Sequence, residues 1–138
     1  MVLTDSGFFF ALANDKDDAH KRSVILYKKY SKSLSTTWPV ITETCHLHLK
    51  KIGPHAQERF INGLSKVSIF EIDKSKLARI ESLMTKYRDL PMDLADASLV
   101  IMAEESNVGN ILSVDYRDFG VHRWKNQKPF NNLMIEDQ

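Results

Sequence analysis

Five acidic residues of the chain stand where one local pattern gives way to another. Asp5 ends a short apolar run, Glu43 lies one turn into a helix that begins at a proline, Asp93 and Asp96 share a helix face, and Asp115 ends a second apolar run. In open α/β sheets, side chains from distant parts of a chain converge beyond the carboxyl ends of the strands. Crowded carboxylates repel one another, whereas a hard divalent cation turns the same crowding into a binding site. The sequence therefore predicts a magnesium or manganese site.

The helix expected over residues 92–105 gives the strongest local evidence for that site. Asp93 and Asp96 are three residues apart, so both lie on one helix face, and Asp89 would extend the stripe if the helix began earlier. The rest of this helix is apolar, which favours a wet or metal-filled crevice around the acids. Asp93 fits a helix cap equally well, but Asp96 lies too deep in the helix for that role.

Each remaining acid also has an explanation without a metal. Asp5 and Asp115 could each cap a helix that follows a strand, and Glu43 could stabilise the start of its own helix. Such explanations must be made separately for every acid, and none accounts for the whole set. A shared metal site is therefore the preferred hypothesis.

Apolar patterning predicts the elements that position these acids. Strands are expected at residues 2–5, 34–37, 67–72 and 111–114. Helices are expected from Phe8, after the acids at 15–18, over 39–51, from Pro54, after Asp73 and over 92–105. Short edge strands are expected at 121–124 and 133–135. This alternation predicts a three-layer α/β fold around a mostly parallel sheet.

Length and composition narrow the class of protein. The 138 residues are 43% hydrophobic, as expected for one domain over residues 1–138. The apolar stretches are far shorter than the roughly 20 residues of a membrane span, no secretory leader pattern is visible, and the single cysteine, Cys45, suits a reducing compartment. We therefore expect a cytoplasmic protein without a membrane segment. The net charge of the protein is +1. If the acids gather in one cleft, the rest of the surface is therefore net basic, which would suit a polyanionic ligand.

Four short motifs resemble those of one known family. They are Asp5-Ser6-Gly7 after the first strand, Thr42-Glu43 in a helix that ends near Gly53, the helical Asp93-Leu94-Ala95-Asp96-Ala97, and Ser113-Val114-Asp115 followed by Asp118-Phe119. In this order and spacing they resemble the PIN-domain nucleases, most closely the VapC toxins of bacterial and archaeal toxin-antitoxin pairs. The resemblance covers nearly the whole chain, although the tail after Phe119 matches poorly. It implies a three-layer α/β/α PIN-like fold.

The resemblance also implies an activity and the residues that carry it. Such a protein would be an endoribonuclease that uses Mg2+ or Mn2+ to hydrolyse RNA phosphodiesters, leaving a 5′-phosphate and a 3′-hydroxyl. It would be the toxin of a pair, would form a homodimer, and would be inhibited by a small antitoxin whose chain crosses the active-site groove. The catalytic and metal-binding residues would be Asp5, Glu43, Asp96 and Asp115, with Asp93 and Asp118 as further metal ligands.

Hydroxyl and basic residues near the acids have weaker assignments. Ser6 and Ser113 could orient carboxylates or water, or could equally be turn hydroxyls that bond the backbone. Basic residues after the last acid could neutralise RNA phosphates, and two aromatic residues among them could stack on bases, although a solvated basic edge explains them as well. They are Arg117, Arg123, Lys125, Lys128, Tyr116 and Trp124.

Several chemically capable side chains are expected to have structural roles. His46 and His48 are two apart on a helix, so they face different ways, make a poor metal pair and are expected at or near the surface. Cys45, Trp38 and the Phe8–Phe10 run are expected in the core, and any exposed part of Trp38 or of the Phe8–Phe10 run could contact a partner.

Two other classes of protein share part of this pattern. Receiver-like and phosphatase-like domains also gather acids at strand ends, but neither explains Glu43, and the phosphatase pattern expects an acid where Gly7 stands. A catalytically silent PIN-like module that binds RNA or protein is the main alternative. It remains open because the sequence does not show that the acids reach the same point, and metal-dependent cleavage would distinguish it from a nuclease.

Overall fold

A five-stranded parallel sheet forms the centre of the molecule. In the computed structural model, which describes residues 1–135, its strands are β1 (Val2–Thr4), β2 (Leu34–Thr37), β3 (Ser68–Phe70), β4 (Asn110–Leu112) and β7 (Asn131–Asn132). Their order is β3-β2-β1-β4-β7, and every neighbouring pair is parallel. All residues of β1 and β2 are buried, as expected for strands covered on both faces. The carboxyl ends of all five strands therefore lie along the same side of the sheet, which we call the carboxyl edge.

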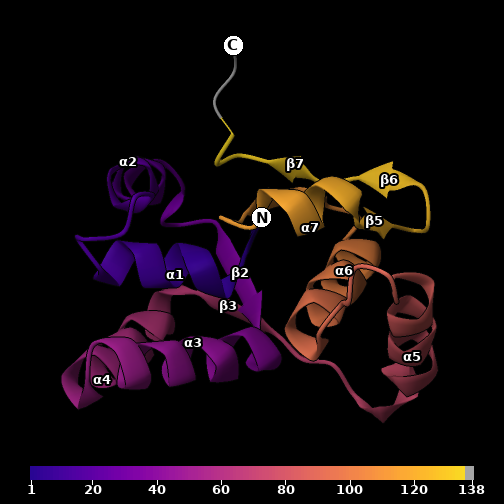
Figure 1. Cartoon of the computed structure of the whole chain (residues 1–138), viewed down its shortest axis with the longest axis horizontal. Coiled ribbons are helices and arrows are strands. Elements are labelled where there is room, and N and C mark those ends of the chain that lie inside the picture. The colour runs from indigo at the N-terminus through magenta and orange to yellow at the C-terminus, as the bar shows by residue number, and fades with distance from the viewer. Residues whose placement is uncertain (136–138) are drawn as a thin grey trace.

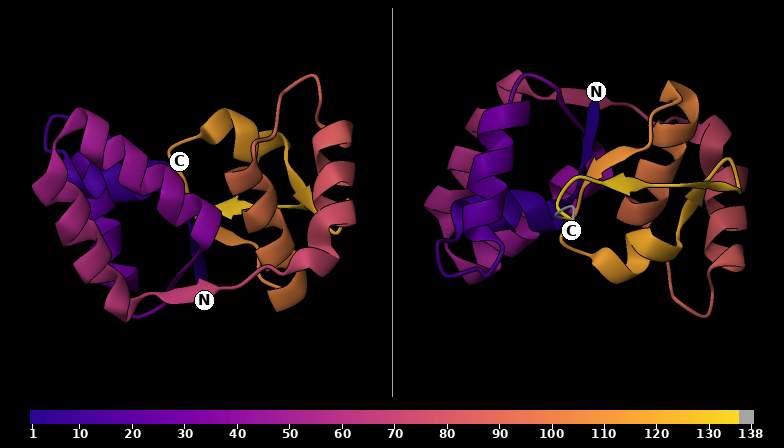
Figure 2. Two further views of the ribbon diagram at one scale, coloured as in Figure 1. Left: turned by 90° about the horizontal axis from the view of Figure 1, so that it is seen from below. Right: turned by 90° about the horizontal axis from the view of Figure 1, so that it is seen from above.

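Helices cover both faces of this sheet (Figure 1, Figure 2). On one side lie α1 (Ser6–Ala13), α2 (His20–Tyr30), α3 (Trp38–Lys51) and α4 (Pro54–Gly63), and on the other lie α5 (Leu77–Lys86) and α6 (Leu94–Ser106). Two short 3-10 turns, η1 (Leu64–Lys66) and η2 (Lys74–Lys76), flank β3. This arrangement confirms the predicted three-layer α/β/α fold.

The burial of α6 fixes its N-terminal end beside the sheet. Every residue from Ala95 to Ala103 is buried, so this helix is enclosed on all sides, as its sequence predicts. It packs against β1, β2, α3 and α5. The hydroxyls of Thr37, at the end of β2, and Ser98 lie 2.6 Å apart and tie the first turns of α6 to the carboxyl end of that strand.

The two short strands predicted at 121–124 and 133–135 differ from the structure in different ways. Residues 121–124 do not join the main sheet, because Val121 ends α7 (Tyr116–Val121) and β5 (Arg123–Trp124) pairs with β6 (Lys128–Pro129) in an antiparallel hairpin. The sheet edge is β7, and not 133–135. Side-chain hydrogen bonds hold it there, since Asn132 Nδ2 donates to the Ser113 carbonyl at 2.9 Å and Asn132 Oδ1 accepts from the Ser113 N–H at 3.3 Å.

Two side chains also lie opposite to expectation. Trp38, expected in the core, is 51% exposed as the first residue of α3, whereas His48, expected at the surface, is 2% exposed and packs against Phe10 and Phe60. Phe8 and Phe9 are buried as predicted, whereas Phe10 and Cys45, also expected in the core, are half-buried. Within residues 1–135, no helix is long and apolar enough to cross a bilayer.

Candidate active site

Two of the predicted acids follow neighbouring strands. Asp5 follows β1 and caps α1, where its Oδ1 accepts the Ser6 N–H at 2.8 Å. Asp115 lies beyond β4 and caps α7, where its Oδ1 accepts the Asp118 N–H at 3.0 Å. Because β1 and β4 are adjacent and parallel, both acids lie at the same edge. Ser113 connects them, since its Oγ donates to Asp5 Oδ2 at 3.1 Å and accepts the Asp115 N–H at 3.0 Å.

Glu43 reaches the same edge from α3. The Ser6 hydroxyl donates a hydrogen bond to Glu43 Oε1, which joins the start of α1 to the middle of α3. Both predicted hydroxyl residues, Ser6 and Ser113, therefore bond carboxylates of the predicted set. Their alternative role as turn hydroxyls also holds in part for Ser113, which bonds the backbone as well.

Asp93 and Asp96 are brought to this edge by the start of α6. Asp93 is the N-cap, and its Oδ1 accepts the Asp96 N–H at 2.8 Å, so the capping role considered for Asp93 is present. Asp96 itself is only 8% exposed. Burial, followed by the charges of Asp93, Asp5, Asp118 and Glu43, raises the pKa of Asp96 to about 8.

Electrostatic repulsion links all six acids, which we call the acidic edge: Asp5, Glu43, Asp93, Asp96, Asp115 and Asp118. Burial and the charges of Asp93 and Asp115 raise the pKa of Asp5 to about 6. Burial and the charges of Asp93 and Asp5 raise the pKa of Glu43 to about 6. The pKa of Asp118 is also raised to about 6, by burial and by Asp115. The structure therefore brings the predicted acids into one mutually repelling set.

Among the described residues, no ion pair with Lys or Arg offsets this repulsion; the charge of Arg117 acts to lower the pKa of Asp118 alone. The ion pairs formed within residues 1–135 involve other carboxylates, those of Glu58, Glu104 and Glu105. His122 is fully buried nearby, against the rings of Tyr87 and Phe119. Burial lowers the pKa of His122 despite the charges of Asp115 and Asp93, so this ring does not neutralise them.

The donor set fits a hydrated hard cation. All six donors are carboxylates, and carboxylate oxygen is the ligand that Mg2+ and Mn2+ prefer. Within residues 1–135, no three His, Cys, Asp or Glu side chains converge closely enough to ligate one ion directly. Mg2+ usually keeps several waters and takes only one or two carboxylates directly, so an ion bound largely through water suits this spacing.

Two of the four basic residues expected to contact substrate, Arg123 and Lys125, form hydrogen bonds within the protein. Arg123 Nη1 donates to the carbonyls of Gly120, Val121 and His122 and so caps the end of α7. Lys125 Nζ donates to Asn107 Oδ1 at 2.9 Å. Trp124 is buried and its Nε1 donates to the Pro129 carbonyl, whereas Arg117, Lys128 and Tyr116 are exposed. A role in substrate binding remains a prediction for these residues.

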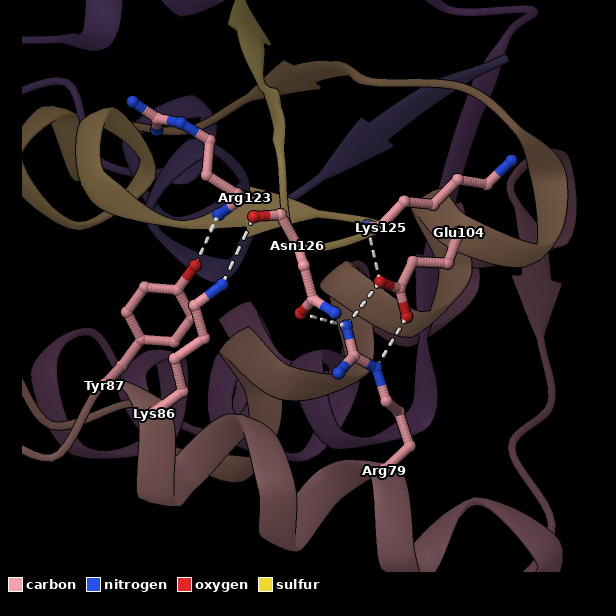
Figure 3. Close-up of polar contacts among 7 residues, drawn as sticks. All are labelled: Arg79, Lys86, Tyr87, Glu104, Arg123, Lys125 and Asn126. Atoms are coloured by element: carbon pink, nitrogen blue, oxygen red, sulfur yellow. Dashed lines mark hydrogen bonds and ion pairs between the residues drawn. The ribbon is translucent and has the colours of Figure 1, made fainter.

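Figure 3 shows how the hairpin that carries Lys125 is fastened to α5 and α6. The guanidinium of Arg79 donates to both carboxylate oxygens of Glu104, at 3.0 and 2.6 Å, and to Asn126 Oδ1 at 3.1 Å. The Lys125 N–H also donates to Glu104. We call Arg79, Glu104, Lys125 and Asn126 the Arg79 clamp.

A groove between α3 and the start of α6 adds Trp38, Pro39 and His46 to the residues of the predicted motifs. Its volume is about 650 Å3, and its lining is Trp38, Pro39, Thr42, Glu43, His46, Asp93, Leu94 and Ala95. Glu43 and Asp93 belong to the acidic edge, so the groove opens onto the candidate site. The four-residue spacing of Trp38, Thr42 and His46, which places them on one face of α3, is the signal that could have revealed it.

Comparison with known proteins agrees with this geometry. The chain resembles the crystal structure of VapC20 from Mycobacterium tuberculosis, described as a toxin that cleaves the sarcin-ricin loop, with a TM-score of 0.77 and 17% sequence identity over 85% of this chain and 92% of that one. Comparison with curated proteins gives no sequence match. The model of the PIN domain family matches residues 2–123. The chain therefore belongs to the PIN domain family.

Proposed function

We propose that this protein is a metal-dependent endoribonuclease, and that the acidic edge is its active site. The observation that carries the proposal is the mutual repulsion of six carboxylates beside the carboxyl ends of the strands, none of which forms an ion pair with a Lys or Arg of residues 1–135. Such a set is unfavourable unless protons or an external cation occupy it. Membership of the PIN domain family supports the nuclease reading.

The proposed roles follow from the contacts of each residue. Asp5, Glu43, Asp96 and Asp115 would hold Mg2+ or Mn2+, with Asp93 and Asp118 as further ligands. When bound, the ion lowers the pKa of a water and stabilises the charge that develops on the phosphate. Ser6 and Ser113 hold the Glu43 and Asp5 carboxylates in place. Asp96 retains a proton near neutral pH until positive charge is supplied, because its pKa is raised to about 8. Cleavage would leave a 5′-phosphate and a 3′-hydroxyl.

We further propose that the protein is a cytoplasmic toxin of a toxin-antitoxin pair and a homodimer. The likeness in fold to VapC20, described as a sarcin-ricin loop cleaving toxin, supports this assignment. Its partners would then be RNA and an antitoxin that covers the active-site groove. A short neighbouring gene for a DNA-binding antitoxin, and suppression of toxicity when the two genes are expressed together, are the expected observations.

The nuclease proposal is tested by RNA cleavage with the purified protein. We expect cleavage with Mg2+ or Mn2+, none with EDTA, and loss of cleavage in Asp96→Asn. Asp18→Asn is the matched control, because Asp18 is an exposed acid outside the acidic edge. RNA binding without cleavage under any metal condition would favour the silent binding module, and robust cutting by Asp96→Asn would remove the role assigned to Asp96.

A further inference from the structure

Trp38 occupies an unusual position beside the acidic edge. It directly follows β2 as the first residue of α3 and is 51% exposed, whereas Trp124 is 8% exposed. The backbone around it is fixed, because the Thr37 side chain caps the helix at Val40 N–H and Pro39 is the next residue. A large ring is therefore presented to solvent from a rigid support.

The ring also stands between two hollows. It lines the groove that contains Glu43, His46 and Asp93, and it lines a neighbouring hollow of about 590 Å3 that contains Ile72 and Leu77. The first of these places the ring within the candidate active site. The second contains none of the acids of the acidic edge and leaves open space beside the ring.

The groove is negatively charged, so a nucleic acid would need an uncharged contact to bind there. Its described lining includes two carboxylates and neither lysine nor arginine. A phosphate backbone near these carboxylates is repelled, so the groove itself supplies no electrostatic attraction to it. Stacking of a base on an aromatic ring is independent of that charge, tolerates any base, and is a common way to bind single-stranded RNA.

We propose that Trp38 is a base-stacking subsite for single-stranded RNA, a proposal that rests on the proposed nuclease function. A nucleobase next to the scissile phosphodiester stacks on the indole ring while the phosphate lies at the acidic edge. The subsite binds an unpaired base and disfavours a base held in a duplex. Trp38 therefore contributes to the preference for single-stranded substrate and to its affinity.

Tryptophan fluorescence tests the stacking directly and without cleavage. In EDTA, we expect a short oligoadenylate RNA to quench the emission of the native protein and to leave that of Trp38→Phe, which retains only Trp124, unchanged. An abasic ribose-phosphate chain of the same length should quench neither protein. Equal quenching by the abasic chain, or full quenching in Trp38→Phe, would overturn the proposal.

Cleavage kinetics provide the second measurement. For Trp38→Ala we expect the KM for single-stranded RNA to rise about 5- to 150-fold, the range for loss of one stacked base. Trp38→Phe should recover much of the affinity and Trp38→Leu little of it, because only the former keeps an aromatic face. Leu77→Ala is the control, since Leu77 is a 58% exposed neighbour in the second hollow and does not line the acidic groove.

The two proposals fail separately. Quenching without any RNA cleavage would refute the nuclease and leave the subsite standing, and cleavage with an unchanged KM in Trp38→Ala would refute the subsite alone. Sedimentation of the same variants tests whether the exposed ring is covered by a second copy of the chain. Dissociation of an oligomer on Trp38→Ala, with Leu77→Ala behaving alike, would assign the ring to that interface and overturn the subsite.

Discussion

Carboxylates are withdrawn from solvent at two places in this molecule, and the protein supplies a cation at one of them. In the Arg79 clamp, Glu104 accepts hydrogen bonds from Nε and Nη2 of Arg79 and from the Lys125 backbone N–H. At the acidic edge, Asp5 and Asp96 are more deeply buried, and Asp5 accepts two hydrogen bonds, but no Lys or Arg among residues 1–135 forms an ion pair with either acid. The paired carboxylate fastens elements together, whereas buried carboxylates without such a partner mark a candidate functional site.

The largest expected effect separates these two regions by activity. Asp5→Asn should reduce RNA cleavage by about 10²-fold or more, the usual scale for losing one group that stabilises the reacting charges. Stability should not fall, because Asn caps α1 as well as Asp does and the change removes repulsion from Asp93 and Asp115. Cleavage rates in Mn2+ measure the loss of activity, and urea unfolding in EDTA measures the stability. Loss of stability with full activity would reverse the comparison.

The acidic edge should also give metal-free stability an unusual pH dependence. The pKa values of Asp5 and Glu43 are raised to about 6 and that of Asp96 to about 8, so the folded protein holds protons that the unfolded chain has already released. Stability must therefore fall as pH rises from about 5 to 8, with a slope of about 1.4 kcal/mol per pH unit for each such proton.

Urea unfolding in EDTA at several pH values measures that slope. The Asp96→Asn variant is the matched comparison, since it lacks the group with the highest raised pKa and should lose most of the upper part of the decline. A stability that rises through this window would show that the acids are compensated in the folded protein.

Loss of a carboxylate from the Arg79 clamp should lower stability and leave activity unchanged, the opposite of the result expected at the acidic edge. Glu104→Gln removes a charged partner from Arg79 and should cost about 1–3 kcal/mol of unfolding free energy, while cleavage per folded molecule stays unchanged. Glu105→Gln is the control, because Glu105 pairs with Lys76 at a more exposed site and such pairs contribute about 0–1 kcal/mol. A large activity loss in Glu104→Gln at full stability would contradict the structural role of the clamp.

The sequence predicted those parts of the molecule in which a backbone pattern determines the position of a side chain. Asp5 and Asp115 were identifiable because an apolar run followed by an acid marks the end of a strand, and adjacent parallel strands bring such ends together. Asp96 was identifiable because an acid inside an otherwise apolar helix has no ordinary surface role. In these cases a backbone pattern determines where the side chain lies.

Other features depend on side-chain contacts that no pattern encodes. β7 contains two asparagines and is held by the amide of Asn132, so no apolar alternation marks it. Arg123 turns back onto the carbonyls of α7, a choice of rotamer and not of sequence spacing. Trp38 is exposed because it shares a face of α3 with Thr42 and His46, which are exposed as well, so its size alone was a poor guide to its burial.

The smallest expected effect tests the acidic edge by adding the missing cation. Mg2+ or Mn2+ at about ten times its Kd should raise the unfolding free energy by ~1.4 kcal/mol, and the melting temperature by a few degrees, because the ion binds the folded chain and relieves its repulsion. Glu104→Gln should keep this shift although its baseline stability is lower, and Asp96→Asn should reduce it. Sodium chloride at matched ionic strength corrects for general screening. A shift of equal size in Asp96→Asn would place the bound ion away from the acidic edge, because only there does removal of one carboxylate also remove a ligand.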